Sequence, residues 1–124
     1  MTFSQLRSAV LVTAGLLASG ITFAASGDAD FTLVNRTGSE IREIYVSPTK
    51  RSEWGRDRLG DKTLANGASR HFRFGDTASC RQDIKVVFED NTPDVTWDNL
   101  DLCATEKVTI RFDRKTRRAT AETE

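Results

Sequence analysis

The chain of 124 residues has one histidine, two cysteines and no surplus of either charge, and these shortages exclude several classes of protein. Eighteen basic residues balance eighteen acidic residues, so no strong field attracts nucleic acid or an anionic membrane, and neither partner is expected. Two thiols and the single His71 are too few for a structural zinc site, which usually has four ligands. The sequence contains no catalytic or cofactor-binding motif, so we expect neither enzymatic activity nor a cofactor.

Long apolar runs are also missing, apart from one near the start of the chain. Ala9–Ala18 is an apolar run of about ten residues, whereas a membrane-spanning helix needs about 20. Arg7 precedes this run and small residues follow it, which is typical of a signal peptide, although a buried N-terminal helix is the alternative. We expect cleavage after Ala24, which predicts a periplasmic or secreted protein with a net charge of −1 and no stable membrane anchor.

Both cysteines lie beyond the predicted cleavage point, so export would place them in an oxidising compartment. Residues 83–89 and 94–99 read as two strands joined by a polar turn, with Cys80 and Cys103 just outside them. We therefore predict a hairpin that a Cys80–Cys103 disulfide locks at its open end. Such a bond closes a loop of about 24 residues and contributes about 3 kcal/mol on the chain-entropy estimate.

The rest of the chain is rich in short strand-like segments and lacks apolar residues at helical spacing. Residues 31–46 predict another hairpin, with a β-bulge between Ile41 and Ile44 because these two apolar positions differ by three. In residues 107–112, the alternation turns Val108, Ile110 and Phe112 toward the core. We expect an all-β fold, a small antiparallel β-sandwich or open barrel of about six strands, in residues 25–112, and a flexible tail in residues 113–124.

The longest irregular segment, residues 47–67, offers the best candidate for a binding surface. Trp54 and Leu59 are its large apolar residues before Leu64, and we expect Trp54 to anchor a tightly folded loop against the sheet. Rigidly held loops commonly carry binding sites. The candidate binding residues are Tyr45, Arg51, Trp54, Asp57 and Arg58.

Other residues suggest weaker sites, each with a simpler explanation. Glu89, Asp90 and Asp94 could hold calcium, but acids are also common in solvated turns. Trp54, Trp97 and Tyr45 could form an aromatic platform or simply close the ends of a small core. His71 could be a general base or a surface residue on a strand. The basic residues of the tail could touch phosphate or be solvated: Arg114, Lys115, Arg117 and Arg118.

Spaced blocks of residues run from Phe31 to about Phe112: Phe31-x-Leu33-x-Asn35-x-Thr37-Gly38, Ile44-Tyr45-Val46-Ser47-Pro48, Trp54-Gly55-x-Asp57-x-Leu59-Gly60, Leu64-x-x-Gly67 and Cys80-x-x-Asp83-Ile84-x-Val86-x-Phe88. In these blocks the chain resembles small exported bacterial single-domain proteins that generally carry no assigned function. The resemblance implies a bacterial, exported, single-domain protein, and it brings no catalytic residues.

Together these observations predict a small exported binding module without catalytic activity. We expect a monomer that presents the loop of residues 47–60 to a protein or glycan partner. The alternative from another class is a calcium-dependent structural protein of the cell envelope that uses the acidic turn at residues 89–94.

Overall fold

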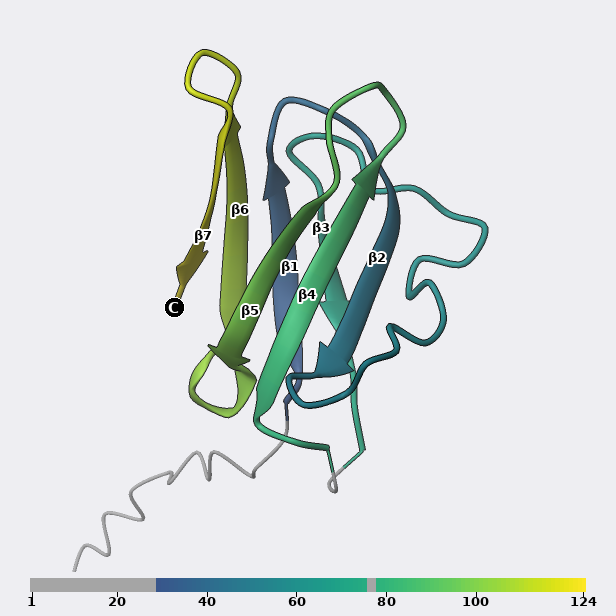
Figure 1. The fold of residues 1–124 in the computed structure, drawn as a ribbon, viewed down its shortest axis with the longest axis vertical. Helices are drawn as coiled ribbons and strands as arrows, with labels where there is room; N and C mark the ends of the chain where they lie inside the picture. The colour runs from purple at the N-terminus through teal and green to yellow at the C-terminus, as the bar shows by residue number, and fades with distance from the viewer. Residues whose placement is uncertain (1–28, 76–77) are drawn as a thin grey trace, which may run out of the picture.

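The computed structural model describes residues 29–75 and 78–124, which form seven β-strands and one short 3-10 helix (Figure 1). The predicted signal peptide, residues 1–24, lies outside the described residues. The elements are β1 (Phe31–Arg36), β2 (Ile41–Pro48), β3 (Ser69–Phe72), β4 (Arg81–Phe88), β5 (Val95–Asp101), η1 (Leu102–Ala104), β6 (Lys107–Asp113) and β7 (Arg118–Thr123).

None of the described residues belongs to a helix that is long and apolar enough to cross a membrane.

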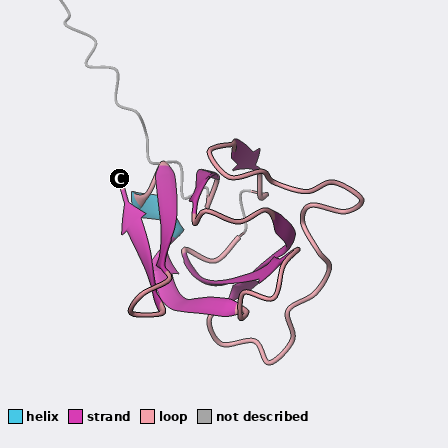
Figure 2. Cartoon of the chain, turned by 90° about the horizontal axis from the view of Figure 1, so that it is seen from above, coloured by secondary structure: helices cyan, strands magenta, loops and turns pink. Residues whose placement is uncertain are grey.

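The strands form two sheets that face each other across one core (Figure 2). One sheet has the strand order β3-β1-β6-β7 and the other has the order β2-β4-β5. Neighbouring strands run antiparallel except β1 and β6, which run parallel with Leu33 opposite Val108. The prediction of an all-β, mainly antiparallel sandwich is confirmed, although the structure has one strand more than expected.

The core follows from the two-residue alternation of side chains along the strands. In β4, Ile84, Val86 and Phe88 are all buried, as the sequence predicts. Residues from both sheets complete the interior, so each sheet covers the apolar face of the other. The largest fully buried side chains include Phe31, Leu33, Ile41, Ile44, Ile84, Leu102 and Ile110.

The predicted hairpin and disulfide between Cys80 and Cys103 are confirmed. β4 and β5 pair antiparallel, and Cys80 and Cys103 form a disulfide with their Cα atoms 5.0 Å apart. The predicted bulge in β2 is also present, as a register shift between Ile41 and Glu43 opposite β4.

The predicted hairpin over residues 31–46 is wrong, because β1 and β2 belong to different sheets. The turn after β1 is present, but it carries the chain from one sheet to the other rather than back along β1. Asn35 holds this crossing in place, since its buried amide nitrogen donates to the backbone carbonyls of Ser39 at 2.8 Å and Leu64 at 3.0 Å. Its Oδ1 accepts from the backbone N–H and the hydroxyl of Thr37.

The prediction of a tail without strand structure over residues 113–124 is also wrong. Arg118–Thr123 forms β7, which pairs with β6 in an unbroken antiparallel register from Asp113–Arg118 to Val108–Thr123. The backbone ladder with β6 and the packing of Ala121 on the core stabilise a strand that has no large apolar side chain. The pattern of apolar residues alone therefore did not predict this strand.

Candidate functional site

The loop between β2 and β3 is held against the sheet by Asp57 and Leu59 rather than by Trp54. Oδ1 of Asp57 accepts hydrogen bonds from the backbone N–H groups of Ile44 and Leu59, both at 2.9 Å. The N–H of Arg58 donates to the carbonyl of Ile44 at 2.7 Å. Leu59 is buried, whereas Trp54 stays half-buried outside the core. The prediction that Trp54 anchors the loop is therefore wrong, because a carboxylate and a smaller apolar side chain make the attachment.

The other candidate residues of this loop are mostly engaged within the protein. The Tyr45 hydroxyl donates to Glu43 Oε1 at 2.7 Å, and this hydrogen bond is the main cause that raises the pKa of Tyr45 to about 12. The Arg58 guanidinium lies 4.9 Å from the centre of the Phe74 ring, and burial lowers the pKa of Arg58. Arg51 is exposed. Asp57, Arg58 and Tyr45 thus support the fold, which leaves Arg51 and Trp54 as the accessible candidates.

The acidic turn does not gather its carboxylates into a cation site. In the part of the chain that the structure describes, one group of three potential metal ligands comes together, namely Cys80, Asp101 and Cys103, and both of its sulfurs form the disulfide. Asp90 uses its carboxylate for contacts within the protein instead. Glu89 and Asp94 are exposed and do not join it in such a group.

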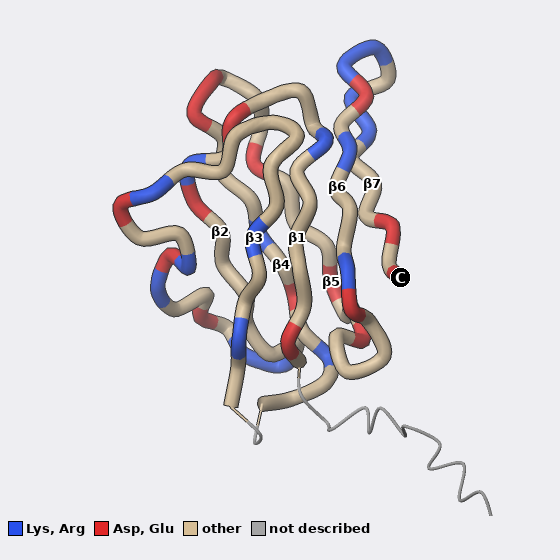
Figure 3. The backbone as a smooth tube through the Cα atoms, turned by 180° about the vertical axis from the view of Figure 1, so that it is seen from behind, with Lys and Arg blue, Asp and Glu red and all other residues tan. Residues whose placement is uncertain are grey.

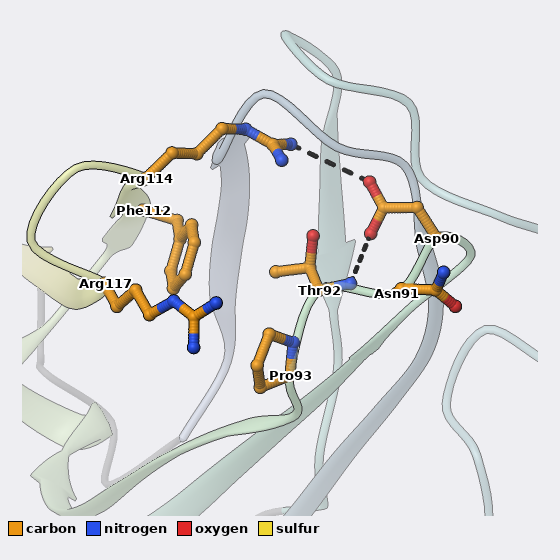
Figure 4. Close-up of a pocket in the computed structure, with 7 residues that line it drawn as sticks. All are labelled: Asp90, Asn91, Thr92, Pro93, Phe112, Arg114 and Arg117. Atoms are coloured by element: carbon orange, nitrogen blue, oxygen red, sulfur yellow. Dashed lines mark hydrogen bonds and ion pairs between the residues drawn. The ribbon is translucent and has the colours of Figure 1, made fainter.

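A groove between two turns is a further candidate site, and it was not predicted from the sequence (Figure 4). The turn between β4 and β5 forms one wall, and the turn between β6 and β7 forms the other. The groove is open to solvent and has a volume of about 410 Å³. It is lined by Asp90, Asn91, Thr92, Pro93, Phe112, Arg114 and Arg117.

A hydrogen-bonded network fixes the rim of the groove. Asp90 Oδ2 accepts from the Ser39 hydroxyl at 2.7 Å and lies 3.7 Å from the Arg114 guanidinium, which also donates to the Ser39 hydroxyl. Asp90 Oδ1 accepts from the backbone N–H of Thr92 at 2.8 Å. Hydrogen bonds from the hydroxyls of Thr92 and Ser39 are the largest causes that lower the pKa of Asp90 to about 2. The network joins the turn after β4 to both the turn after β1 and the turn after β6.

Phe112 and Arg117 form the interior of the groove. Phe112 lies on the core-facing side of β6, as predicted, but it is half-buried and outside the core cluster, which ends on this strand at Ile110. Arg117 has a left-handed backbone conformation, with φ of 55°, and its side chain points into the space between Phe112 and Pro93 (Figure 4). Among the described residues, its guanidinium has neither a hydrogen bond nor an ion pair. The groove thus combines an accessible aromatic ring with a free cation.

Further basic residues gather around the turn between β6 and β7 (Figure 3). Arg36, Arg111 and Arg118 line a neighbouring depression that shares Phe112 with the groove. Arg111 lies 3.5 Å from Glu122, whereas Arg36, Lys115 and Arg118 form no side-chain ion pair with any residue that the structure describes. The sequence shows the basic residues of positions 114–118. Because this segment was predicted to be a flexible tail, its position beside β1 and Phe112 was not predicted.

None of the remaining candidates lines this groove. His71 is exposed on β3, and its Nδ1 lies 3.0 Å from the hydroxyl of Thr32. Trp97 packs against the core from β5, which favours the core interpretation over an aromatic platform with Trp54. Asn35, which begins an Asn-x-Thr acceptor pattern for glycosylation, is completely buried and therefore not accessible for that modification in the folded protein.

These observations define the chain as a small two-sheet β-sandwich with a disulfide across the open end of one hairpin and a cationic groove at one end. No family model matches the chain, and no curated protein matches it. Among solved structures, it is similar to the NMR structure of a protein from Eubacterium rectale, with a TM-score of 0.56 and 17% identity. The likeness covers 81% of this chain and 91% of that one, and at this identity it shows the fold alone.

Proposed function

We propose that the protein is an exported bacterial binding module without catalytic activity, which recognises an anionic group beside an apolar surface of a protein or glycan partner. The observation that carries this proposal is the Arg117 guanidinium, which is unpaired among the described residues and lies in a groove beside the accessible Phe112 ring. A guanidinium donates several hydrogen bonds in a fixed plane and pairs with carboxylate or phosphate in a bidentate way. An adjacent ring adds apolar contact area.

The rigidity of the groove supports this function. The Ser39, Asp90 and Arg114 network holds the two turns in place, so a ligand would meet walls that are already formed. A preformed site loses less conformational entropy on binding than a flexible one. The disulfide supports the exported location, because disulfides persist mainly in oxidising compartments.

The test compares two charge reversals in capture of partners from native envelope extracts. Arg117→Glu should abolish capture because it places a negative charge where the anionic group binds. Arg51→Glu, in the exposed loop after β2, should retain capture and serves as the matched control. Both variants should melt at the temperature of the unchanged protein, since neither side chain has a described partner in the fold. Capture should also weaken as salt is added.

The opposite pattern would overturn the assignment of the site. Loss of capture with Arg51→Glu, and not with Arg117→Glu, would assign binding to the loop of residues 47–60. Equal capture by the unchanged protein and both variants would show that neither the groove nor the loop of residues 47–60 binds the partner.

A further inference from the structure

The four edge strands of the two sheets differ in how their outer backbone groups are protected. At the edge of β2, Asp57 and the N–H of Arg58 bond to both backbone groups of Ile44. β3 has only four residues. β5 is interrupted by Asn99, which has a left-handed φ of 58°. Short strands, irregular residues and covering loops are the devices by which proteins prevent pairing at sheet edges.

β7 has none of these devices. Its six residues keep one register with β6, contain no proline, and lie at the outer side of their sheet (Figure 1). Among the described residues, no strand pairs with its outer edge. A regular, uncovered edge is a template for pairing with another strand.

The hydrogen-bond pattern shows which residues of β7 have outward backbone groups. Lys107 and Glu124 exchange both of their backbone hydrogen bonds, at 3.1 and 2.8 Å. Because such pairs alternate along an antiparallel ladder, Thr120 and Glu122 also bond to β6. The N–H and C=O groups of Ala119, Ala121 and Thr123 therefore point away from β6.

The sequence of β7 complements itself in the register that these outward groups require. When two copies pair antiparallel about Thr120, Ala119 of each copy lies opposite Ala121 of the other, and their outward groups form the ladder. Arg118 of each copy then lies opposite Glu122 of the other, in the closely spaced non-hydrogen-bonded positions where cross-strand charge pairs interact best. The small alanines present no bulk on the core-facing side of the new junction.

We propose that two copies of this chain associate through β7. The two β7 strands pair antiparallel and join the two four-stranded sheets into one continuous sheet. This inference is independent of the groove, and it departs from the monomer expected from the sequence and from the flexible tail expected over residues 113–124. A second copy is favoured over a foreign extended segment because β7 itself supplies the opposite charges at the matching positions.

The test is a charge swap followed by sedimentation velocity over a range of protein concentrations, using protein expressed from the full-length sequence. Glu122→Arg alone and Arg118→Glu alone should each weaken dimerisation by about tenfold, since each change creates two like-charge pairs in the dimer. The double variant Arg118→Glu with Glu122→Arg should restore dimerisation, because opposite charges again face each other across the junction. Glu122→Arg and the double variant both lose the Arg111–Glu122 ion pair within one copy, so the loss of that pair cannot explain a restored dimer.

A backbone readout separates this junction from other dimers. The amides of Ala119, Ala121 and Thr123 should become protected from hydrogen exchange as protein concentration rises, and Ala121→Pro, which removes one outward donor, should abolish the dimer. Three results would each overturn the proposal. The protein could stay monomeric at millimolar concentration, or its dimerisation could be unchanged by the charge swap. The third is protection of these amides only when an extended peptide is added.

Discussion

At the scale of single residues, polar side chains with several partners hold the ends of the sandwich together. Asn35 is completely buried and bonds to Thr37, Ser39 and Leu64, so it links the strand β1, the crossing segment and the loop before β3. A buried amide with all its partners is favourable, but each partner left alone in the interior is costly.

Replacing Asn35 should therefore be among the most damaging single changes in the chain. Asn35→Ala leaves the buried N–H of Thr37 without its acceptor, and a buried polar group without a partner costs about 1–3 kcal/mol. The carbonyls of Ser39 and Leu64 also lose one hydrogen bond each, although each keeps a second donor. Urea unfolding should show this loss as a lower free energy of unfolding. Asn91→Ala, in an exposed turn, is the control and should stay within about 0.5 kcal/mol of the unchanged protein. Equal stability of the two variants would contradict the role of Asn35.

Asp90 gives a prediction for pH dependence. Its pKa in the folded protein is lowered from 3.8 to about 2, chiefly by the Thr92 hydroxyl and then by the Ser39 hydroxyl. A lowered pKa means that the ionised carboxylate favours the folded state above pH 3.8, and that this contribution is lost as the pH falls toward 2. Thr92→Val should raise the pKa of Asp90 in an NMR titration of the carboxyl carbon. Asn91→Ala should leave it near 2.

At the scale of elements, the β4–β5 hairpin is the part of the fold that the sequence predicts most fully. Alternation in residues 83–89 identifies the buried face, and the two cysteines identify the pairing, because a disulfide needs its Cα atoms close together. The attachment of the β2–β3 loop was not predictable in the same way. Asp57 bonds to Ile44, thirteen positions earlier in the chain, and an irregular segment has no periodicity to show where its carboxylate points.

The disulfide should stabilise this hairpin measurably. Cys80→Ser should lower the free energy of unfolding by about 3 kcal/mol, because the loop of about 24 residues is no longer closed in the unfolded chain. Urea unfolding of the oxidised protein, the Cys80→Ser variant and the Cys80→Ser, Cys103→Ser double variant measures the difference, and the two variants should agree. The intact mass of the unreduced protein should be lower by two hydrogens than that of the reduced protein. Free thiols in the native protein would refute the bond.

At the scale of the whole molecule, the sequence shows that the protein is a β-sandwich but not how its strands are ordered. The turn at Thr37-Gly38 is visible in the sequence, yet a turn does not say whether the next strand returns to the same sheet. The pairing of β1 with β6 joins segments more than seventy positions apart, and alternation within each strand is the same for either neighbour. Phe112 was placed on the correct face, but its exposure depends on where the opposite sheet ends.

The parallel pairing of β1 with β6 also has a consequence for biosynthesis. β1 is made early, whereas its parallel neighbour is complete only after Asp113 has been added. Until then Phe31 and Leu33 lack the strand that completes their side of the sheet, and non-local strand pairing of this kind forms slowly. The nascent chain therefore cannot finish the sandwich while its later strands are still being translated, so β1 stays without its parallel neighbour until β6 is complete.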